Sequence, residues 1–423
     1  MDVQVFKFGG ASVKDAPAIE NLQNILRRYP DEHLVVVISA MGKTTNFLEK
    51  LLSAYHHKSG NVDALVDELQ QQHEQVAIQL VPDPGSILDR LRKLFAELRM
   101  RLSIEPSGNY DFDYDQIVSF GELLSTTLIS GYLNIAGIAN VWLDARRLVR
   151  TDSTYREGVL DWETSCQQIR ATVSDCFARQ SRVVLTQGFI AGTAEHLTTT
   201  LGREGSDYSA AIMAYALDAK NVTIWKDVPG LLNADPKRFP EAVKLDRIPY
   251  EEAVELSYYG ASIIHPKTLK PLQNKQIPLY VKSFFYPDDA GSVITNCPLN
   301  TDIPSYIVKD HQTLITIFPK DFSFIAVDNL SEIFAVLSRY RVRINLMQNS
   351  ALSFSICSDV EPDRLRRCIE CLQNQYKVKY NEDVQLFTIR HYTQEAVDKV
   401  IGQREMLVRQ TSRATIQFVV KPN

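Results

Sequence analysis

Short hydrophobic stretches separated by longer helical repeats organise the first 300 residues of the chain. Residues 3–8 alternate apolar and polar side chains, while residues 34–38 form a continuous apolar, mostly β-branched run, typical of a strand covered on both faces. Similar runs occupy residues 183–185, 222–225 and 278–281. Helical repeats lie between them, among them residues 19–26, 91–102 and 123–133. This order predicts an α/β fold with a mainly parallel sheet sandwiched by helices.

After about residue 300 the pattern changes to shorter elements. The order strand, helix, strand, strand, helix, strand is typical of a ferredoxin-like α+β module. Its segments are residues 314–318, 331–338, 344–346, 352–357, 363–373 and 378–380. A shorter set follows at residues 386–389, 395–401, 407–408 and 416–420. Because the printed chain ends there, we expect the second module to be abridged unless the two modules share elements.

A glycine-rich loop, KFGGAS at residues 7–12, follows the first predicted strand and precedes a helix. Exposed backbone N–H groups at such a junction bind anions. Adjacent Gly9 and Gly10 let the backbone approach a phosphate closely, and Lys7 can supply a mobile positive charge. The structural alternative for this loop is a plain chain reversal, with Lys7 as a solvated lysine at the strand end.

A second glycine-rich loop, TTTLGREGSD, spans residues 198–207. Gly202 and Gly205 flank Arg203, whose planar guanidinium suits a carboxylate. Ser206 and Asp207 can cap the helix that follows. Both loops fall at the carboxyl ends of predicted strands, where parallel α/β sheets bind ligands.

Together with other segments, the two loops resemble the aspartokinase family, a branch of the amino-acid kinase fold. The motifs occur in family order over roughly the first seven-tenths of the chain and are jointly very specific. They are KFGGASV (7–13), SAMGKTTN (39–46), SFGE (119–122), TQGFI (186–190), the second glycine loop, WKDVPG (225–230) and HP (265–266). In the same comparison, the ferredoxin-like segments resemble the ACT regulatory modules that aspartokinases carry.

The resemblance implies three domains: a catalytic amino-acid kinase domain at residues 1–298, a first ACT-type module at residues 299–384, and a second, abridged module at residues 385–423. Some family members carry a fused dehydrogenase. The chain leaves no room for a third large domain, so we expect a monofunctional kinase.

The resemblance also implies a reaction, transfer of the ATP γ-phosphoryl group to the side-chain carboxylate of L-aspartate. The product, 4-phospho-L-aspartate, is the first intermediate toward lysine, threonine and methionine. A carboxylate is already ionised at neutral pH, so catalysis reduces to positioning and charge neutralisation. Mg²⁺ is expected mainly through the ATP phosphates, with no dedicated metal-binding residue. The residues implied in catalysis are Lys7, Gly9, Gly10, Ser39 and Asp207.

Recognition of the amino acid is assigned to two charged residues and to three residues that line the pocket. Arg203 is expected to bind the α-carboxylate, and Glu122 to pair with the ammonium group. The structural alternative for Glu122 is an acid that stabilises a helix N-terminus. The expected walls are Thr45, Phe189 and Ser206.

On the nucleotide side, the chain departs from better-known relatives. Lys226 stands where threonine or serine is common, and Leu232 where some members carry an aromatic residue. Ser262 replaces a lysine that commonly approaches the phosphates, which weakens phosphate binding unless Lys226, Lys237 or Lys267 takes over. The residues assigned to nucleotide binding are Lys7, Lys226, Asp227, Gly230, Leu232, Lys237 and Ser262.

The ACT-type modules imply binding of an effector amino acid, lysine or threonine. The residues assigned to it are Asn329, Asn345, Gln348, Asn349 and Ser350. Asn345 replaces a frequent aspartate, which would be the natural partner of an effector ammonium. The alternative is a dimerisation platform without a ligand. Either way, the strand edges of these modules favour a homodimer.

Composition narrows the class of protein further. A net charge of −5 gives no electrostatic reason to expect nucleic acid or acidic membrane as a partner. No apolar run approaches the length of a bilayer span, and the six cysteines form no disulfide framework, so we expect a cytoplasmic protein. Cys368 and Cys371 form a C-x-x-C pair inside a helical pattern, without a second pair to complete a zinc site.

Two other functions remain open from the sequence. One is phosphorylation of another small amino acid or carboxylate by the same fold. The other is a non-catalytic amino-acid sensor, motivated by Ser262 and the altered nucleotide side. Retention of Lys7, Glu122, Arg203 and Asp207 favours catalysis over the sensor, because a sensor has no need for a phosphoryl cradle.

Overall fold

The computed structural model describes residues 2–179, 181–261, 264–299, 303–321 and 323–422. The chain forms two compact units. The first comprises residues 1–231, 244–254 and 263–299, and the second comprises residues 232–243, 255–262 and 300–423, apart from positions outside the described ranges. Each unit is described by itself below.

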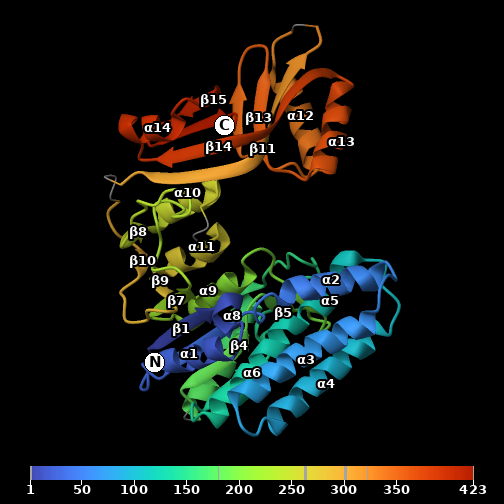
Figure 1. Ribbon diagram of the computed structural model, residues 1–423, viewed down its shortest axis with the longest axis vertical. Helices are drawn as coiled ribbons and strands as arrows, with labels where there is room; N and C mark the ends of the chain where they lie inside the picture. Colours follow the sequence, from blue (N-terminus) through green and yellow to red (C-terminus); the bar gives the residue numbers. More distant parts are fainter. Residues whose placement is uncertain (1, 180, 262–263, 300–302, 322, 423) are drawn as a thin grey trace. The chain divides into compact units, whose positions relative to one another are not determined.

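The first unit is built on an eight-stranded sheet in the order β3-β4-β2-β1-β7-β9-β10-β8 (Figure 1). Every neighbouring pair is parallel except β9 and β10. The strands are β1 (Val3–Phe8), β2 (His33–Ile38), β3 (Asn140–Leu143), β4 (Val183–Gln187), β7 (Asn221–Lys226), β8 (Arg247–Pro249), β9 (Leu279–Ser283) and β10 (Ser292–Thr295). A separate antiparallel hairpin joins β5 (Ile190–Gly192) and β6 (Thr198–Thr200). The predicted parallel α/β sheet is thus confirmed.

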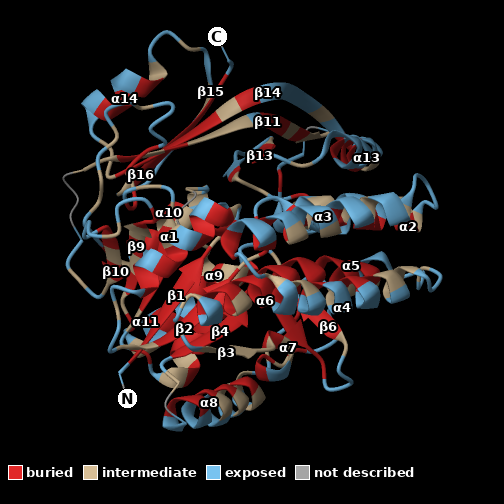
Figure 2. Cartoon of the chain, turned by 60° about the horizontal axis from the view of Figure 1, so that its bottom comes forward, coloured by how far each residue is buried: buried red, intermediate tan, exposed pale blue. Residues whose placement is uncertain are grey.

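Helices cover both faces of this sheet, and the central strands are buried (Figure 2). Phe6 and Phe8 of β1 join a core cluster with α1, α3, α4 and α6, whereas Val5 points to the opposite face, where α9 packs. The helices of this part are η1 (Gly10–Val13), α1 (Ala16–Leu26), α2 (Thr44–His56), α3 (Val62–Leu80), α4 (Gly85–Leu102), α5 (Tyr110–Val118), α6 (Phe120–Ile135), α7 (Ala145–Leu148), α8 (Trp162–Ala178), α9 (Gly205–Leu217), α10 (Tyr250–Tyr259) and α11 (Pro266–Lys275).

Two of these helices, α5 and α6, position residues of the candidate site. The Asn109 side chain caps α5 by accepting hydrogen bonds from the amides of Asp111 and Phe112. After Ser119, α6 begins at once, and it is apolar on most sides because it packs inside the unit. The two helices therefore form one nearly continuous, deeply buried support.

The second unit contains a six-stranded antiparallel sheet in the order β12-β13-β11-β14-β16-β15. Its first module has the predicted ferredoxin-like order of elements, and its helices α12 and α13 share one hydrophobic core. The elements are β11 (Ser305–Pro319), α12 (Val327–Arg339), β12 (Leu346–Asn349), β13 (Phe354–Ser358), α13 (Pro362–Gln373), β14 (Tyr376–Arg390), α14 (Gln394–Ile401), β15 (Met406–Thr411) and β16 (Thr415–Val420). These features confirm the expected ACT-type architecture.

The two modules share their long central strands. The predicted strands at residues 378–380 and 386–389 are not separate, because both belong to β14. The first half of β11, from Ser305 to Lys309, pairs with the second half of β14, while the second half of β11 pairs with the first half of β14. The second module therefore obtains its fourth strand from residues 305–309, which lie ahead of the first predicted strand of the first module at residues 314–318.

Candidate active site

The first glycine loop lies at the centre of the parallel sheet, between the ends of β2 and β7. Gly9 follows β1, and η1 continues from it at Gly10. Ser39 follows β2, and its amide donates a hydrogen bond to the Phe8 carbonyl, 3.1 Å from nitrogen to oxygen. Because β1, β2, β4 and β7 are parallel, Gly9, Ser39, Gly188 and Asp227 all lie at the same edge of the sheet.

Gly10 interlocks the first loop with the segment after β2. The Gly42 amide donates to the Gly10 carbonyl at 3.0 Å. A Cβ atom on Gly10 would lie 2.8 Å from the Gly42 carbonyl oxygen and 2.9 Å from that of Ala40. Both neighbours are backbone atoms that cannot rotate away, so the close approach of the two loops requires glycine at position 10.

Replacing Gly10 by alanine is expected to lower the free energy of unfolding by about 1–3 kcal/mol, the usual cost of overpacking. Gly9→Ala is the matched control, because its new Cβ would meet only the Lys7 ammonium, 3.4 Å away at the end of a flexible side chain. Urea unfolding of both variants measures the difference. Equal stability of the two variants would contradict the interlocked arrangement.

Lys7 and Asp207 bring the two glycine loops together. The Lys7 ammonium lies 2.6 Å from Oδ1 of Asp207, and the two side chains are only 11% and 6% exposed. This burial excludes the alternative in which Lys7 is a solvated lysine at the strand end. The geometry places one positive and one negative group beside the glycine backbone, nearly 200 residues apart in the sequence.

Glu122 lies in the first turn of α6 and is almost fully buried. Its Oε1 atom accepts a hydrogen bond from the Ala40 amide at 3.2 Å. Its Oε2 atom is buried and has no hydrogen-bond partner among the described residues. Burial raises the pKa of Glu122 to about 8, against the lowering effect of the Ala40 hydrogen bond. A buried, unsatisfied carboxylate oxygen is suited to a cationic ligand.

The second glycine loop turns sharply before α9. Glu204 adopts a left-handed backbone conformation (φ 54°) and is the N-cap of α9, so the prediction that Ser206 and Asp207 cap this helix was wrong. Both residues instead lie within its first turn. The Glu204 carboxylate accepts a hydrogen bond from the His265 amide at 2.8 Å. Arg203 precedes Glu204 and is exposed, so its guanidinium is open to a ligand.

Close packing of small residues joins the end of β4 to the start of α9. A Cβ atom on Gly188 would lie 2.6 Å from that of Ser206, and one on Gly205 would lie 2.7 Å from the Phe189 ring. Phe189 is half-buried in a left-handed conformation (φ 67°), and its amide donates to the Ser209 hydroxyl. The structure thus brings Phe189 and Ser206 together, while Thr45 lies half-buried in the first turn of α2.

The residues assigned to the nucleotide are only partly brought together. Lys226 ends β7 and Asp227 follows it, while Gly230 adopts a conformation (φ 155°) that brings its backbone against Ser292. Leu232 and Lys237 lie in residues 232–243, which cluster with the second unit, and Lys237 is exposed there. Ser262 lies outside the described residues.

Lys267 is engaged by the second glycine loop. Its ammonium donates to the Leu201 carbonyl at 3.1 Å and lies 4.8 Å from the centre of the Tyr208 ring. Desolvation lowers its pKa. Of the three lysines that could replace the charge missing at Ser262, Lys267 therefore already has a structural role.

The residues assigned to an effector do not form one open cluster. The Asn329 side chain accepts from the Ala326 amide at the start of α12. The Asn345 side chain accepts from the Lys309 ammonium and donates to Gln312, both at 2.8 Å. Gln348 and Asn349 are exposed on β12, and Ser350, which follows, bonds to Ser353. Asn345 is thus committed to contacts within its own unit.

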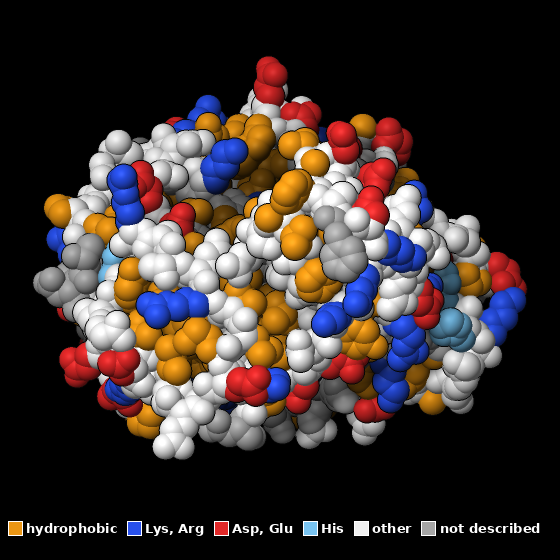
Figure 3. Space-filling view, turned by 90° about the horizontal axis from the view of Figure 1, so that it is seen from above, with side chains coloured by type: hydrophobic (Ala, Val, Ile, Leu, Met, Phe, Trp, Pro, Cys, Tyr) orange, Lys and Arg blue, Asp and Glu red, His pale blue; other side chains and the backbone are white. Residues whose placement is uncertain are grey.

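The strand β12 forms an edge of the six-stranded sheet and is accompanied by exposed hydrophobic side chains. Met347 is 52% exposed, and Phe324 and Val327 are 73% and 80% exposed. The face of the molecule in Figure 3 likewise shows hydrophobic side chains among charged ones. An open edge with apolar neighbours is the kind of surface on which a second copy of a chain can pair.

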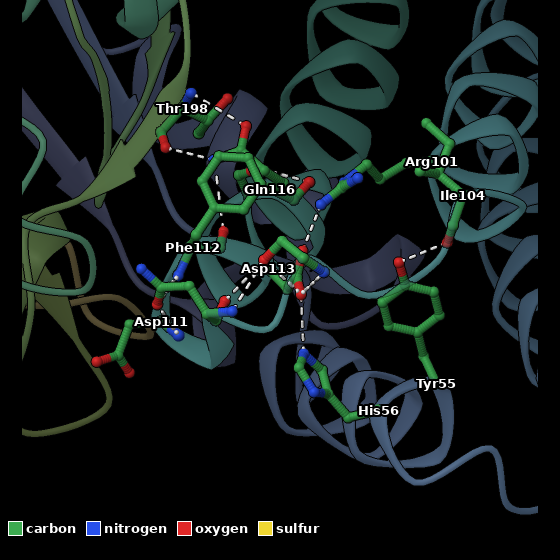
Figure 4. A network of polar contacts seen from close by, with 12 residues as sticks. Tyr55, His56, Arg101, Ile104, Asp111, Phe112, Asp113, Gln116 and Thr198 are labelled. Atoms are coloured by element: carbon green, nitrogen blue, oxygen red, sulfur yellow. Dashed lines mark hydrogen bonds and ion pairs between the residues drawn. The ribbon is translucent and has the colours of Figure 1, made fainter.

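Two buried acids on α5 were missed in the sequence. Asp113 and Asp115 are both fully buried. Asp113 accepts hydrogen bonds from Arg101, from His56 at 2.9 Å, and from the amide and hydroxyl of Ser107, as Figure 4 shows for part of this network. It ties α2 and α4 to α5. The available signal was three acids, at 111, 113 and 115, that alternate with aromatic residues in the helix leading into SFGE.

Among the described residues, no group of three or more His, Cys, Asp or Glu side chains is arranged to bind a metal ion. No helix in the described part of the chain combines the length and the apolar character that a bilayer crossing requires.

Comparison with known proteins identifies relatives of this architecture. The model of the amino acid kinase family matches residues 2–283. The chain is 30% identical to the lysine-sensitive aspartokinase 3 of Escherichia coli over 366 residues, which cover 85% of the chain and 78% of that protein. It is 34% identical to a chloroplastic bifunctional aspartokinase/homoserine dehydrogenase of Zea mays over 301 residues, or 70% of the chain. It spans only about a third of the length of that maize protein.

The fold is also similar to solved structures of E. coli aspartokinase III. The complex of that enzyme with aspartate and ADP has a TM-score of 0.83 at 26% identity, and the match covers 99% of this chain and 96% of the other. The complex with lysine and aspartate has a TM-score of 0.81 at 26% identity, covering 100% and 96%. The similarity thus extends through the ferredoxin-like modules.

Proposed function

The chain belongs to the amino acid kinase family and, within it, to the aspartokinases, and from this premise we propose that it transfers the γ-phosphoryl group of ATP to the side-chain carboxylate of L-aspartate. The product is 4-phospho-L-aspartate, the start of the route to lysine, threonine and methionine. The solved relative that binds aspartate and ADP supports this assignment.

The observation that carries the proposal is the position of residues 39–42. This segment contacts the first glycine loop through Ser39 and Gly42, and it also donates the Ala40 amide to Glu122. A phosphate cradle and a buried carboxylate with one unsatisfied oxygen are thus joined by four consecutive residues. A substrate that carries both an ammonium group and a phosphoryl acceptor fits such a site.

In this mechanism the ionised side-chain carboxylate of aspartate attacks the γ-phosphorus. A phosphorus–oxygen bond forms to the carboxylate, and the bond to the bridging oxygen breaks, so that the electron pair leaves with ADP. No proton is removed from the nucleophile. Lys7 and the amides of Gly9 and Gly10 neutralise charge on the moving group, with Ser39 beside them. Arg203 and Glu122 orient the substrate through its α-carboxylate and ammonium groups.

The nucleotide is assigned to the end of β7, where Lys226, Asp227 and Gly230 lie. Leu232, Lys237 and Ser262 remain assigned to it from the family motifs. Mg²⁺ would be held mainly by the ATP phosphates, because it keeps most of its water ligands, with Asp207 as the carboxylate beside the cradle. When bound, Mg²⁺ would neutralise phosphate charge.

Regulation and assembly are part of the proposal. The E. coli relative with lysine bound suggests a lysine effector, for which Gln348, Asn349 and Ser350 are the exposed candidates on this chain. The edge strand β12 supports a homodimer through the ACT-type modules. Six free cysteines support a cytoplasmic location.

The test is ATP- and Mg²⁺-dependent formation of an acyl phosphate, trapped with hydroxylamine, from L-aspartate and a panel of related amino acids. Lysine and threonine are added in separate reactions. Product from L-aspartate alone would support the proposal, and loss of product with lysine would support the effector. Product from another amino acid would favour the related kinase, while folded protein that binds an amino acid without forming product would favour a sensor.

A further inference from the structure

Asp115 is a buried carboxylate for which the proposed reaction has no direct use. It lies on α5 and is fully buried. Its Oδ2 atom accepts hydrogen bonds from the amides of Arg156, at 2.9 Å, and Thr200, at 3.0 Å, and its Oδ1 atom accepts from the Thr200 hydroxyl at 2.7 Å. Among the described residues, no Lys, Arg or His forms an ion pair with it. Desolvation raises the pKa of Asp115 to about 6 against these hydrogen bonds, so it is a carboxylate at pH 8.

The partners of Asp115 belong to the base of the second glycine loop. Thr200 ends β6, and Arg203 follows only three residues later. The Gly158 amide donates to the Thr200 carbonyl at 2.9 Å. A Cβ atom on Gly202 would lie 3.2 Å from the Arg156 carbonyl oxygen, so these segments are in close contact. Asp115 therefore clamps residues 156–158 against the segment that leads to Arg203.

The same loop is also held by residues at the start of α11, on both sides of Arg203. Lys267 donates to the Leu201 carbonyl, and the His265 amide donates to Glu204. Contacts thus hold the backbone on both sides of Arg203 while leaving its side chain exposed. Without the Asp115 contacts, the loop would keep its anchors at Leu201 and Glu204 but lose the contacts that hold Thr200 against residues 156–158.

Asp115 and Glu122 lie on two consecutive helices, α5 and α6. Asp115 lies on α5 and Glu122 on α6, seven residues later, with only Ser119 between the two helices. From this geometry we propose that Asp115 is a positioning residue, which sets the separation between Glu122 and Arg203 and thereby the affinity for the amino-acid substrate. This inference rests on the proposed function, because it uses the roles given there to Glu122 and Arg203.

The chemistry of the contacts predicts how substitutions at Asp115 differ. Alanine leaves the amides of Arg156 and Thr200 without this acceptor, and because the Thr200 amide is buried, the loop must shift to satisfy it. Asparagine can keep all three contacts, because its oxygen accepts from both amides while its NH₂ group donates to a Thr200 hydroxyl that has rotated. Asp115→Asn is therefore the conservative variant, and Asp115→Ala the disruptive one.

The experiment measures KM for L-aspartate and for ATP separately in the full chain. Asp115→Ala is expected to raise KM for L-aspartate about tenfold or more, as small misplacements of binding groups do, and to leave KM for ATP within about twofold of wild type, since its contacts lie at the amino-acid side. Asp115→Asn is expected to restore most of the affinity. Thr200→Val, which removes one contact, is expected to lie between wild type and Asp115→Ala, with Thr200→Ser near wild type.

Asp113→Ala is the matched control, since Asp113 is equally buried on the same helix but bonds to Arg101, His56 and Ser107 instead. Asp113→Ala is expected to lower the stability of the protein but to change KM for L-aspartate and KM for ATP by similar factors. If Asp115→Ala does not fold, the comparison of Thr200→Val with Thr200→Ser tests the positioning role instead. Equal effects on both KM values, or none in Thr200→Val, would overturn the positioning role. A wild-type protein that forms no acyl phosphate from L-aspartate would overturn the proposed function first.

Discussion

Replacing Lys7 by alanine is expected to lower kcat for acyl phosphate formation by about 10³-fold, while the protein stays folded. Removal of a single preorganised group that stabilises transition-state charge typically costs about 10²–10³ in kcat. Here the loss should reach the upper end, because it also leaves Asp207 unpaired beside the incoming phosphate. Hydroxylamine trapping at saturating ATP and L-aspartate measures kcat, and circular dichroism checks the fold.

Lys14→Ala is the control for this prediction. Lys14 lies at the end of the same loop but is 59% exposed, and its ammonium is 4.0 Å from Asp15. Its removal should leave kcat unchanged.

The charge argument also predicts that Lys7→Met combined with Asp207→Asn loses no more affinity for ATP than Lys7→Met alone, because the repulsive carboxylate is gone. Near-normal turnover in Lys7→Ala would contradict the role given to the cradle.

The catalytic fold could be predicted well from the sequence because its strands are buried on both faces. Residues 34–38 and 183–185 form continuous apolar runs, which do not occur on a solvent-facing sheet, and the structure places them side by side on the buried strands β2 and β4. Glycine at positions 9 and 10 is likewise visible without a structure. Local sequence patterns therefore predicted strands β1, β2, β4, β7 and β9 and the edge where the site lies, but not the shorter strands β3, β8 and β10.

The shared strands of the ACT-type modules could not be predicted in the same way. Residues 305–309 were not identified as a strand, because their partner, the second half of β14, lies about 80 residues away in the chain. A strand that serves two modules has no local signature. Which segments belong to the second module therefore depends on pairing between distant strands, and the sequence around each strand does not reveal that pairing.

The candidate site was likewise predicted from the sequence only in part. The motifs gave Lys7 and Asp207 as separate residues, and the structure adds that they form a buried pair. Ser206 was misassigned as a helix cap because the left-handed conformation of Glu204 shifts the start of α9. Asp115 was missed since an acid in a helix normally faces solvent, and only the packing of β6 against α5 shows that it is buried.

The affinity for L-aspartate is expected to rise with pH up to about pH 8 because of Glu122. Burial raises the pKa of this carboxyl from 4.5 to about 8 in the free protein. Below that pH the group is protonated and neutral, so binding an ammonium group must expel its proton. In that range kcat/KM for L-aspartate should increase about tenfold per pH unit and level off above pH 8. Its raised pKa also means that the free protein loses stability as pH rises from 4.5 to about 8, where only the unfolded chain has ionised this group, and L-aspartate should restore it.

Glu122→Gln tests this account, because it keeps the size of the side chain and removes its titration. The variant is expected to lose about 10²-fold or more in kcat/KM for L-aspartate, the usual cost of removing one member of a buried charge pair. The pH dependence between 6.5 and 8 should flatten at the same time. A variant that loses activity but keeps the wild-type pH profile would show that another group titrates there. In that case Glu122 would act as a helix N-terminal acid, which stabilises α6 without pairing with the substrate.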